Sequence, residues 1–294
     1  MRVAGIDCGT NSIRLLVADA IDGHLVDVVR EMRIVRLGEG VDRTGQLLPA
    51  ALERTQVALT DYAATIAAQG AQRVRMIATS ATRDAANRAV FVAMVRDVLG
   101  VEPEVISGAE EAALSFAGAA DGLPTVTGRL LVADIGGGST ELVLGEASAP
   151  HALRSSSMDV GCVRMTERHL HDDPPTPGQI RATVDELRTA IEATAEEVDI
   201  TAQATFVGLA GTVTTIAAIA LGLQHYDAAA IHGSVLTAAQ VHEVTARLLA
   251  MTHDERAALP VMHPGRVDVI NGGALVLRTL LEATGASEVI ASEH

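Results

Sequence analysis

Two short segments with the same order of residue types carry the clearest chemistry in this chain. One reads Asp7-Cys8-Gly9-Thr10-Asn11-Ser12 and the other Asp134-Ile135-Gly136-Gly137-Gly138-Ser139, and each lies between two apolar runs. Glycines let backbone N–H groups approach an anion, and successive amides in a turn form a cradle for phosphate oxygens. The leading carboxylate would repel phosphate, so it is suited to hold a divalent cation. The pattern predicts a metal and phosphate clamp; the plain alternative is a pair of tight turns rich in Gly and Ser.

The two segments belong to a longer internal repeat. Residues 6–17 align with residues 133–144 without a gap, and Asp, Gly, Ser and Leu recur in the same register. Such a repeat predicts two copies of one supersecondary unit and therefore two lobes of related fold. We place the first lobe at residues 1–120 and the second at residues 121–294.

The composition excludes several kinds of chemistry. The 294 residues contain 22 basic side chains, all of them Arg, against 37 acidic ones, for a net charge of −15. Without Lys there is no Schiff base and no P-loop lysine. The acidic balance and the 2% aromatic content argue against a nucleic-acid partner. Residues 1–99 hold 12 Arg and 11 acids, so the acidic excess lies in the rest of the chain, which predicts two faces or two lobes with different partners.

The cysteines and the hydrophobic pattern indicate a compartment. Cys8 and Cys162 make no disulfide framework, which favours reduced thiols in a cytoplasmic protein. Asp7 interrupts the apolar core that a signal peptide would need. The longest apolar stretch, residues 215–223, is far shorter than the roughly 20 residues of a membrane span. We therefore expect a soluble chain with no membrane partner.

Hydrophobic spacing and turn residues predict alternating strands and helices along the whole chain. Strands are expected on both sides of each glycine turn and at residues 25–35, 74–78, 104–106, 204–209 and 288–291. Helices are expected at residues 49–69, 84–99, from 107 onward, 177–198, 213–223, 237–251 and 267–284. Residues 118–128 are predicted to be a linker and residues 171–177 a loop, with Thr176 as N-cap and Pro177 as the first residue of the next helix.

The paired turns resemble the phosphate loops of the actin-like ATPase and sugar-kinase superfamily. More narrowly, the chain is similar to the exopolyphosphatase and guanosine pentaphosphate phosphohydrolase (Ppx/GppA) family over residues 3–292. Six motifs stand in family order, at residues 7–12, 78–83, 107–112, 134–141, 161–164 and 208–212. The resemblance implies an α/β fold of two actin-like (ribonuclease H-like) lobes, a duplicated β-hairpin phosphate loop, an active-site cleft between the lobes, and a homodimer. It also implies the short two-domain form, with a turn and a helix following residue 294.

The resemblance implies roles for individual residues. Glu111 matches the catalytic base, and a carboxylate at a helix start can deprotonate a water for in-line attack on phosphorus. Arg83 matches an arginine that would hold the charge of the transferring phosphate. Asp134 and Glu141 match the metal carboxylates, with Mg²⁺ the expected cation. The remaining matches would cradle phosphate: Asn11, Ser12, Gly136, Gly137, Gly138 and Ser139. The plain alternatives are that Glu111 only places a negative charge at a helix N-terminus and that Arg83 is a surface arginine.

Four functions are compatible with these residues. The leading hypothesis is an exopolyphosphatase that releases orthophosphate from inorganic polyphosphate. The alternatives are a guanosine pentaphosphate 5′-phosphohydrolase, a small-molecule kinase that uses ATP, and a sensor that binds (p)ppGpp or polyphosphate without turning it over. The scarcity of aromatic side chains that could stack on a guanine favours polyphosphate.

Other conspicuous patterns are predicted to have no catalytic role. The His169-Leu170-His171-Asp172-Asp173 segment has the residue types of a metal site, but it lies in a proline-flanked loop. Arg30, Arg33 and Arg36 are predicted to be solvated, with a secondary polyphosphate contact as the alternative. Cys162 is interpreted as a small buried residue and not as a nucleophile.

Overall fold

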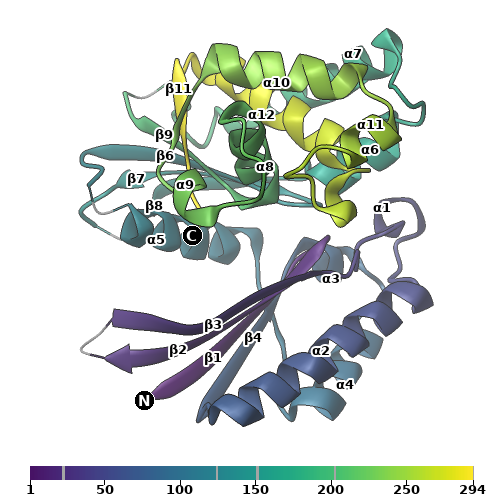
Figure 1. The fold of residues 1–294 in the computed structure, drawn as a ribbon, viewed down its shortest axis with the longest axis vertical. Coiled ribbons are helices and arrows are strands. Elements are labelled where there is room, and N and C mark those ends of the chain that lie inside the picture. Colours follow the sequence, from purple (N-terminus) through teal and green to yellow (C-terminus); the bar gives the residue numbers. More distant parts are fainter. Residues whose placement is uncertain (22–23, 124, 150–151, 202, 294) are drawn as a thin grey trace. The chain divides into compact units, whose positions relative to one another are not determined.

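The computed structural model describes residues 1–21, 24–123, 125–149, 152–201 and 203–293. These residues form two compact units, residues 1–107 and residues 108–294, and both are α/β (Figure 1). The boundary expected after residue 120 lies inside helix α5 (Gly108–Gly122), which is grouped with the second unit. The division into domains 1–120 and 121–294 stays a prediction.

The first unit is a five-stranded mixed sheet in the order β3-β2-β1-β4-β5. Its strands are β1 (Arg2–Cys8), β2 (Ser12–Ile21), β3 (His24–Ile34), β4 (Arg73–Ala78) and β5 (Glu104–Val105). Its helices are α1 (Val41–Thr44), α2 (Pro49–Gln69), α3 (Ser80–Asp84) and α4 (Arg88–Leu99). Strand β2 pairs antiparallel with both β1 and β3, whereas β4 pairs parallel with both β1 and β5.

Local sequence signals explain the main helix of this unit. Helix α2 has Pro49 at its first position, where the fixed φ of proline suits a helix start. It ends at Gly70, whose φ of 66° is left-handed and favours glycine. Its buried Tyr62 donates a hydrogen bond of 3.0 Å to the carbonyl of Ile13 on β2. The predicted helix at residues 49–69 is therefore confirmed, together with the contact that fixes it to the sheet.

The second unit repeats this plan and adds one strand. Its sheet has the order β10-β11-β9-β6-β7-β8. The strands are β6 (Arg129–Ile135), β7 (Thr140–Glu146), β8 (Ala152–Met158), β9 (Thr205–Leu209), β10 (Val235–Thr237) and β11 (Glu288–Ala291). The helices after α5 are α6 (Cys162–His169), α7 (Pro177–Thr194), α8 (Ala210–Ala220), α9 (Ala228–Ile231), α10 (Ala238–Ala250), α11 (His253–Ala257) and α12 (Ile270–Thr284), with a 3₁₀ turn at Pro264–Arg266.

The strand directions match between the two units. The series β8-β7-β6-β9-β11 has the same antiparallel, antiparallel, parallel and parallel pairings as β3-β2-β1-β4-β5. The two glycine turns close equivalent hairpins, β1-β2 and β6-β7. The predicted pair of related α/β lobes with a duplicated β-hairpin is confirmed.

The second sheet is covered on both faces, with α5 on one side and α8, α10 and α12 on the other (Figure 1). Side chains alternate along β6, so that Leu131 and Ala133 enter the larger core, while Leu130 and Val132 pack with Phe116 of α5. Asp134 follows this alternation and lies on the face that α5 covers. Gly145 on β7 allows α5 to approach the sheet closely, because a Cβ at position 145 would lie 2.3 Å from the Phe116 ring.

Several predicted elements differ from the structure. The helix expected at residues 84–99 begins later, at Arg88, as α4, and a short helix that was not predicted, α3, precedes it. The side chain of Asn87, between them, accepts a hydrogen bond from the N–H of Leu47 and donates one to its carbonyl, which fixes the start of α4. Helix α5 extends to Gly122, into the predicted linker, and α7 ends at Thr194. Helix α8 begins at Ala210, three residues before the start of the helix expected at residues 213–223. Strand β8 and helix α6 were not predicted.

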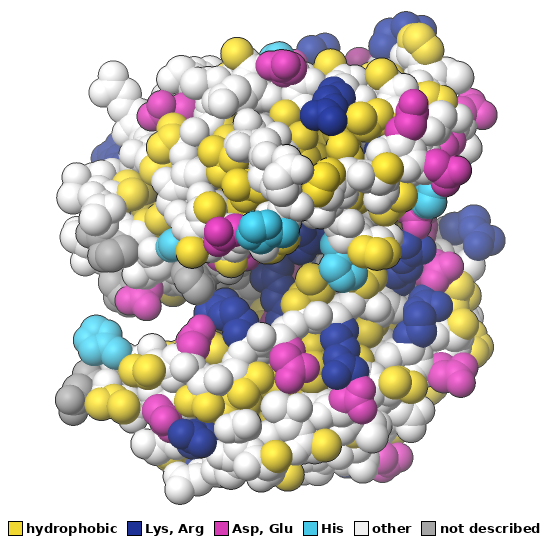
Figure 2. Space-filling model, in the orientation of Figure 1, with side chains coloured by type: hydrophobic (Ala, Val, Ile, Leu, Met, Phe, Trp, Pro, Cys, Tyr) yellow, Lys and Arg dark blue, Asp and Glu magenta, His cyan; other side chains and the backbone are white. Residues whose placement is uncertain are grey.

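The predicted start of helix α7 is confirmed. Thr176 and Gln179 form a complete capping box at the start of α7, with Pro177 as its first residue. None of the helices within the described residues is long and apolar enough to cross a membrane. On the face drawn in Figure 2, acidic and basic side chains are interspersed with hydrophobic ones on both units. Exposed charges pair locally in several places, as Arg75 does with Glu104, and such exposed pairs add little stability.

Candidate active site

Asp134 and Glu141 are brought together by the register of the β6-β7 hairpin. They are directly opposite each other across the antiparallel pair, so their side chains lie on the same face of the sheet. The equivalent positions of the β1-β2 hairpin hold Asp7 and Arg14. Of the two hairpins, only the second therefore presents a pair of carboxylates across its strands.

Serine hydroxyls hold one oxygen of each of these carboxylates. Ser157 on β8 lies opposite Glu141 and donates a hydrogen bond of 2.7 Å to its Oε1 atom. Ser115 on α5 donates one of 2.5 Å to Oδ2 of Asp134. Asp134, Glu141 and Ser157 thus form a row across three neighbouring strands, facing α5. These contacts fix the orientation of both carboxyl groups.

Glu141 is buried in an environment that disfavours its charge. The residue is 1% exposed, and its Oε2 atom has no hydrogen-bond partner. Burial, followed by the negative charges of Glu111 and Asp134, raises the pKa of Glu141 to about 8. Ser139 and Ser157 partly oppose this shift by hydrogen bonding to the carboxylate. The contribution of Glu111 shows that this residue of the first turn of α5 lies close enough to act on Glu141 electrostatically.

A divalent cation fits the Asp134 and Glu141 pair. A buried carboxylate oxygen without a partner carries a desolvation cost that a cation would relieve. Within the described ranges, no group of three or more His, Cys, Asp or Glu residues is arranged to hold a metal. This donor set does not suit structural zinc. Mg²⁺, in contrast, is commonly held by one or two carboxylates together with waters and substrate phosphates.

The second glycine turn, residues 136–139, lies at the end of the same hairpin. A Cβ at Gly136 would lie 2.9 Å from the carbonyl oxygen of Ser139, so the turn is too tight for a larger residue there. Ser139 is buried and hydrogen-bonds to Glu141. The role of residues 136–139 in holding phosphate stays a prediction.

The remaining predicted site residues lie in the first unit. In the turn between β1 and β2, the N–H of Gly9 donates to the carbonyl of Ser12 at 3.0 Å. The carbonyl of Asn11 accepts from the N–H groups of Val35 and Arg36, which ties the turn to the end of β3. Arg83 lies in the last turn of α3 and donates a hydrogen bond of 3.1 Å to the carbonyl of Ile106. The phosphate-binding roles of Asn11, Ser12 and Arg83 stay predictions.

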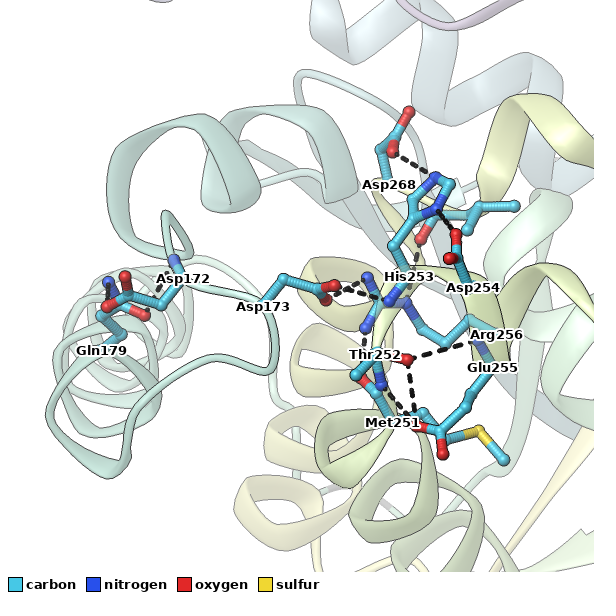
Figure 3. Close-up of polar contacts among 11 residues, drawn as sticks. Asp172, Asp173, Gln179, Met251, Thr252, His253, Asp254, Glu255, Arg256 and Asp268 are labelled. Atoms are coloured by element: carbon cyan, nitrogen blue, oxygen red, sulfur yellow. Dashed lines mark hydrogen bonds and ion pairs between the residues drawn. The ribbon is translucent and has the colours of Figure 1, made fainter.

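The histidine and aspartate segment at residues 169–173 has structural partners. His169 contacts Glu186, and Asp172 accepts a hydrogen bond of 2.9 Å from Gln179. Asp173 points away from Asp172 and Gln179 and accepts hydrogen bonds from the N–H of His253 and from Arg256 (Figure 3). Because each of these side chains contacts a different partner, the contacts fix the segment to its neighbours and do not form a ligand cluster.

The other patterns predicted to have no catalytic role lie in surroundings that fit structural roles, namely local ion pairs and burial. Arg30 pairs with Asp27 and Arg33 with Asp61. The secondary polyphosphate contact of Arg30, Arg33 and Arg36 stays untested. Cys162 is buried, and this burial raises the pKa of its thiol to about 11. The expected burial of Cys162 is therefore confirmed, and because thiolate is the reactive form, the raised pKa favours a packing role.

Three residues around the site were missed by reasoning from the sequence. Ser115 lies four positions after Glu111, on the same face of α5, which was an available signal. Arg164 ends the Gly161-Cys162-Val163-Arg164 motif and donates to the carbonyl of Gly138. Ser157 lies in a strand that was not predicted, so no local signal indicated it.

Comparison with known proteins identifies the family. A model of the Ppx/GppA phosphatase family matches residues 16–294. Exopolyphosphatase 2 of Mycobacterium tuberculosis is 52% identical over 306 aligned positions, which cover 100% of this chain and 95% of that protein. A guanosine-5′-triphosphate,3′-diphosphate pyrophosphatase of Photobacterium profundum is 34% identical over 218 positions, or 74% of this chain and 43% of that protein. The solved structure of an exopolyphosphatase-like protein superposes with a TM-score of 0.96 at 41% identity, covering 100% of this chain and 94% of that one. The chain belongs to the Ppx/GppA phosphatase family and is a hydrolase.

Proposed function

We propose that this chain is an exopolyphosphatase that removes terminal phosphate from inorganic polyphosphate and releases orthophosphate. The observation that carries the proposal is the buried Glu141, whose Oε2 atom lacks a partner and which lies opposite Asp134 and near Glu111. In our proposal Asp134 and Glu141 hold Mg²⁺. When bound, the cation would neutralise charge on the phosphate oxygens. Polyphosphate is favoured because the exopolyphosphatase relative covers the whole chain at 52% identity.

The chemistry assigned to the protein side chains is general base catalysis. The Glu111 carboxylate accepts a proton from a water molecule, and the water oxygen forms a bond to the terminal phosphorus as the bridging phosphoanhydride bond breaks. The products are orthophosphate and a chain shortened by one phosphate. The amides of the turn at residues 136–139 hold the phosphate oxygens. We also propose Asn11, Ser12 and Arg83 as phosphate ligands, on the strength of the internal repeat and the family motifs.

A direct test is phosphate release from long and short polyphosphate, guanosine pentaphosphate and ATP, each with and without Mg²⁺. Glu111→Gln is expected to lower kcat by about 10²- to 10⁴-fold. The matched control is Glu110→Gln, one position away in the same helical turn, which is expected to change kcat by less than about twofold because a surface substitution removes no reacting group. Equal kcat in the two variants would overturn the assignment of Glu111.

The same assay separates the other functions. The second candidate is a guanosine pentaphosphate 5′-phosphohydrolase, which the relatives of that type favour, and higher kcat/KM for the nucleotide would select it. Transfer of phosphate to ADP in place of water would indicate a kinase. Tight binding of polyphosphate without release, unchanged by Glu111→Gln, would indicate a sensor.

We further propose a cytoplasmic setting and a homodimer. The setting is supported by Cys8 and Cys162, which are both buried and form no disulfide. The homodimer rests on the family resemblance, and light scattering of the purified chain tests it through the particle mass.

A further inference from the structure

Helix α6 begins directly against the second glycine turn. The N–H of Cys162 donates to the carbonyl of Gly136 at 2.9 Å, and the N–H of Val163 donates to that of Gly137 at 2.9 Å. These are first-turn N–H groups, which have no partner inside a helix and must find one elsewhere. The turn therefore supplies the N-terminal cap of α6, which no side chain provides.

Arg164 extends this contact to the third glycine. Its Nε atom donates a hydrogen bond of 2.7 Å to the carbonyl of Gly138, and a charged donor makes such a bond short and strong. Gly161 permits the approach, because a Cβ there would lie 2.5 Å from the carbonyl carbon and oxygen of Gly137. The carbonyls of three consecutive glycines are thus all held by one helix end.

The orientation of these carbonyls determines where the amides point. In a planar trans peptide, the C=O of one residue and the N–H of the next point in opposite directions. With the carbonyls of residues 136–138 directed at α6, the N–H groups of Gly137, Gly138 and Ser139 point away from it. These are the donors that a phosphate cradle requires. Glycine peptides otherwise rotate with little restriction, so this orientation depends on the anchor.

We propose that Arg164 is a positioning residue that keeps the peptide between Gly138 and Ser139 oriented with its N–H toward the phosphate. The inference rests on the proposed function, in which this turn binds the terminal phosphate. Arg164 then acts through the turn and does not itself contact the substrate. Its removal lets that peptide rotate, which weakens phosphate binding more than it slows the chemical step.

The test compares Arg164→Met with Arg168→Met, a matched control on the same helix whose arginine pairs with Glu186 at the surface. In Arg164→Met we expect KM for polyphosphate to rise about tenfold, the size of one lost charged hydrogen bond, while kcat changes by less than about threefold. Amide hydrogen exchange in the peptide that covers residues 136–139 is expected to speed up by a similar factor. Arg164→Lys keeps a charged donor and is expected to lie between wild type and Arg164→Met in both measurements.

Two results would overturn the proposal. If Arg164→Met matches Arg168→Met in KM and in exchange, Arg164 does not anchor the turn. If turnover is lost with no change in the exchange of residues 136–139, Arg164 acts on the substrate directly. Absence of phosphate release by the wild-type protein would refute the proposed function alone, since the exchange comparison still decides whether Arg164 orients the turn.

Discussion

Arg256 offers a quantitative test of how the second unit is held together. This arginine is 4% exposed and links three segments through its guanidinium (Figure 3). It donates to the carbonyls of Met251 and Val267 at 2.6 and 3.2 Å and to Oδ1 of Asp173 at 2.9 Å. We predict that Arg256→Met destabilises the unit, because Asp173 and two carbonyls lose a charged donor.

The size of the effect follows from the surroundings. Removing one partner of a buried ion pair costs about 3–5 kcal/mol, but the Asp173 side chain is 42% exposed and stays partly hydrated. The methionine stem replaces much of the buried aliphatic volume. We therefore expect the lower limit, about 3 kcal/mol, which in a unit of this size lowers Tm by about 6–12 °C.

The assay is thermal unfolding followed by circular dichroism at pH 7. Arg188→Met serves as the control, because Arg188 is 57% exposed and lies 3.5 Å from Glu282; its Tm is expected to change by less than about 2 °C. A fall in Tm for Arg256→Met no larger than that of the control would refute the view that the buried guanidinium braces these three segments.

The same pair predicts a dependence on pH. Burial acts to raise the pKa of Asp173, but the His253 N–H and the Arg256 guanidinium outweigh it and hold the pKa below its usual value. A carboxyl group with a lowered pKa in the folded state stabilises the protein above its unfolded pKa, and that stability is lost as the pH falls through the folded value. Wild-type Tm should therefore fall more steeply below pH 4 than that of Arg256→Met. Equal slopes would contradict this linkage.

Two further substitutions test the site and the sheet beneath it. Ser157→Ala removes the donor to Oε1 of Glu141 and is expected to weaken Mg²⁺ binding by about tenfold. The measurement is titration calorimetry on the folded apoprotein. Unchanged Mg²⁺ affinity would show that Ser157 does not orient Glu141. Gly145→Ala places a Cβ 2.3 Å from Phe116, and such overpacking is expected to cost about 1–3 kcal/mol in urea unfolding. Gly5→Ala is the control, because a Cβ at that position would meet no atom within 4 Å. Equal losses of unfolding free energy in the two variants would show that α5 can shift away from β7.

Much of the fold could be predicted because its signals are local. Proline and glycine flank α2, and the internal repeat indicated both hairpins before any strand pairing was known. The late start of α4 could not be predicted, since it depends on Asn87 contacting Leu47, forty positions away. Strand β8 was missed because its Ser-rich sequence lacks β-branched residues, and only pairing with β7 makes it a strand.

The candidate site likewise contains residues that local sequence signals predict and contacts that depend on the folded structure. Asp134 and Glu141 could be assigned to one predicted metal site because both match positions of a family motif. The contacts that orient them come from Ser115 and Ser157, on elements before and after the hairpin, so they depend on tertiary packing. The burial that raises the pKa of Glu141 is likewise a property of the folded unit, to which α5 contributes the nearby charge of Glu111.

The cross-strand pairs of the two hairpins have a consequence for how such a protein can diversify. Both hairpins keep the same backbone register, yet one pairs Asp7 with Arg14 and the other pairs Asp134 with Glu141. A duplicated scaffold can thus preserve its hydrogen-bonding pattern while a single side chain reverses the local charge. Exchange of Arg14 for Glu would make the two copies chemically alike, so position 14 offers a route to engineering a second acidic pair into an existing lobe.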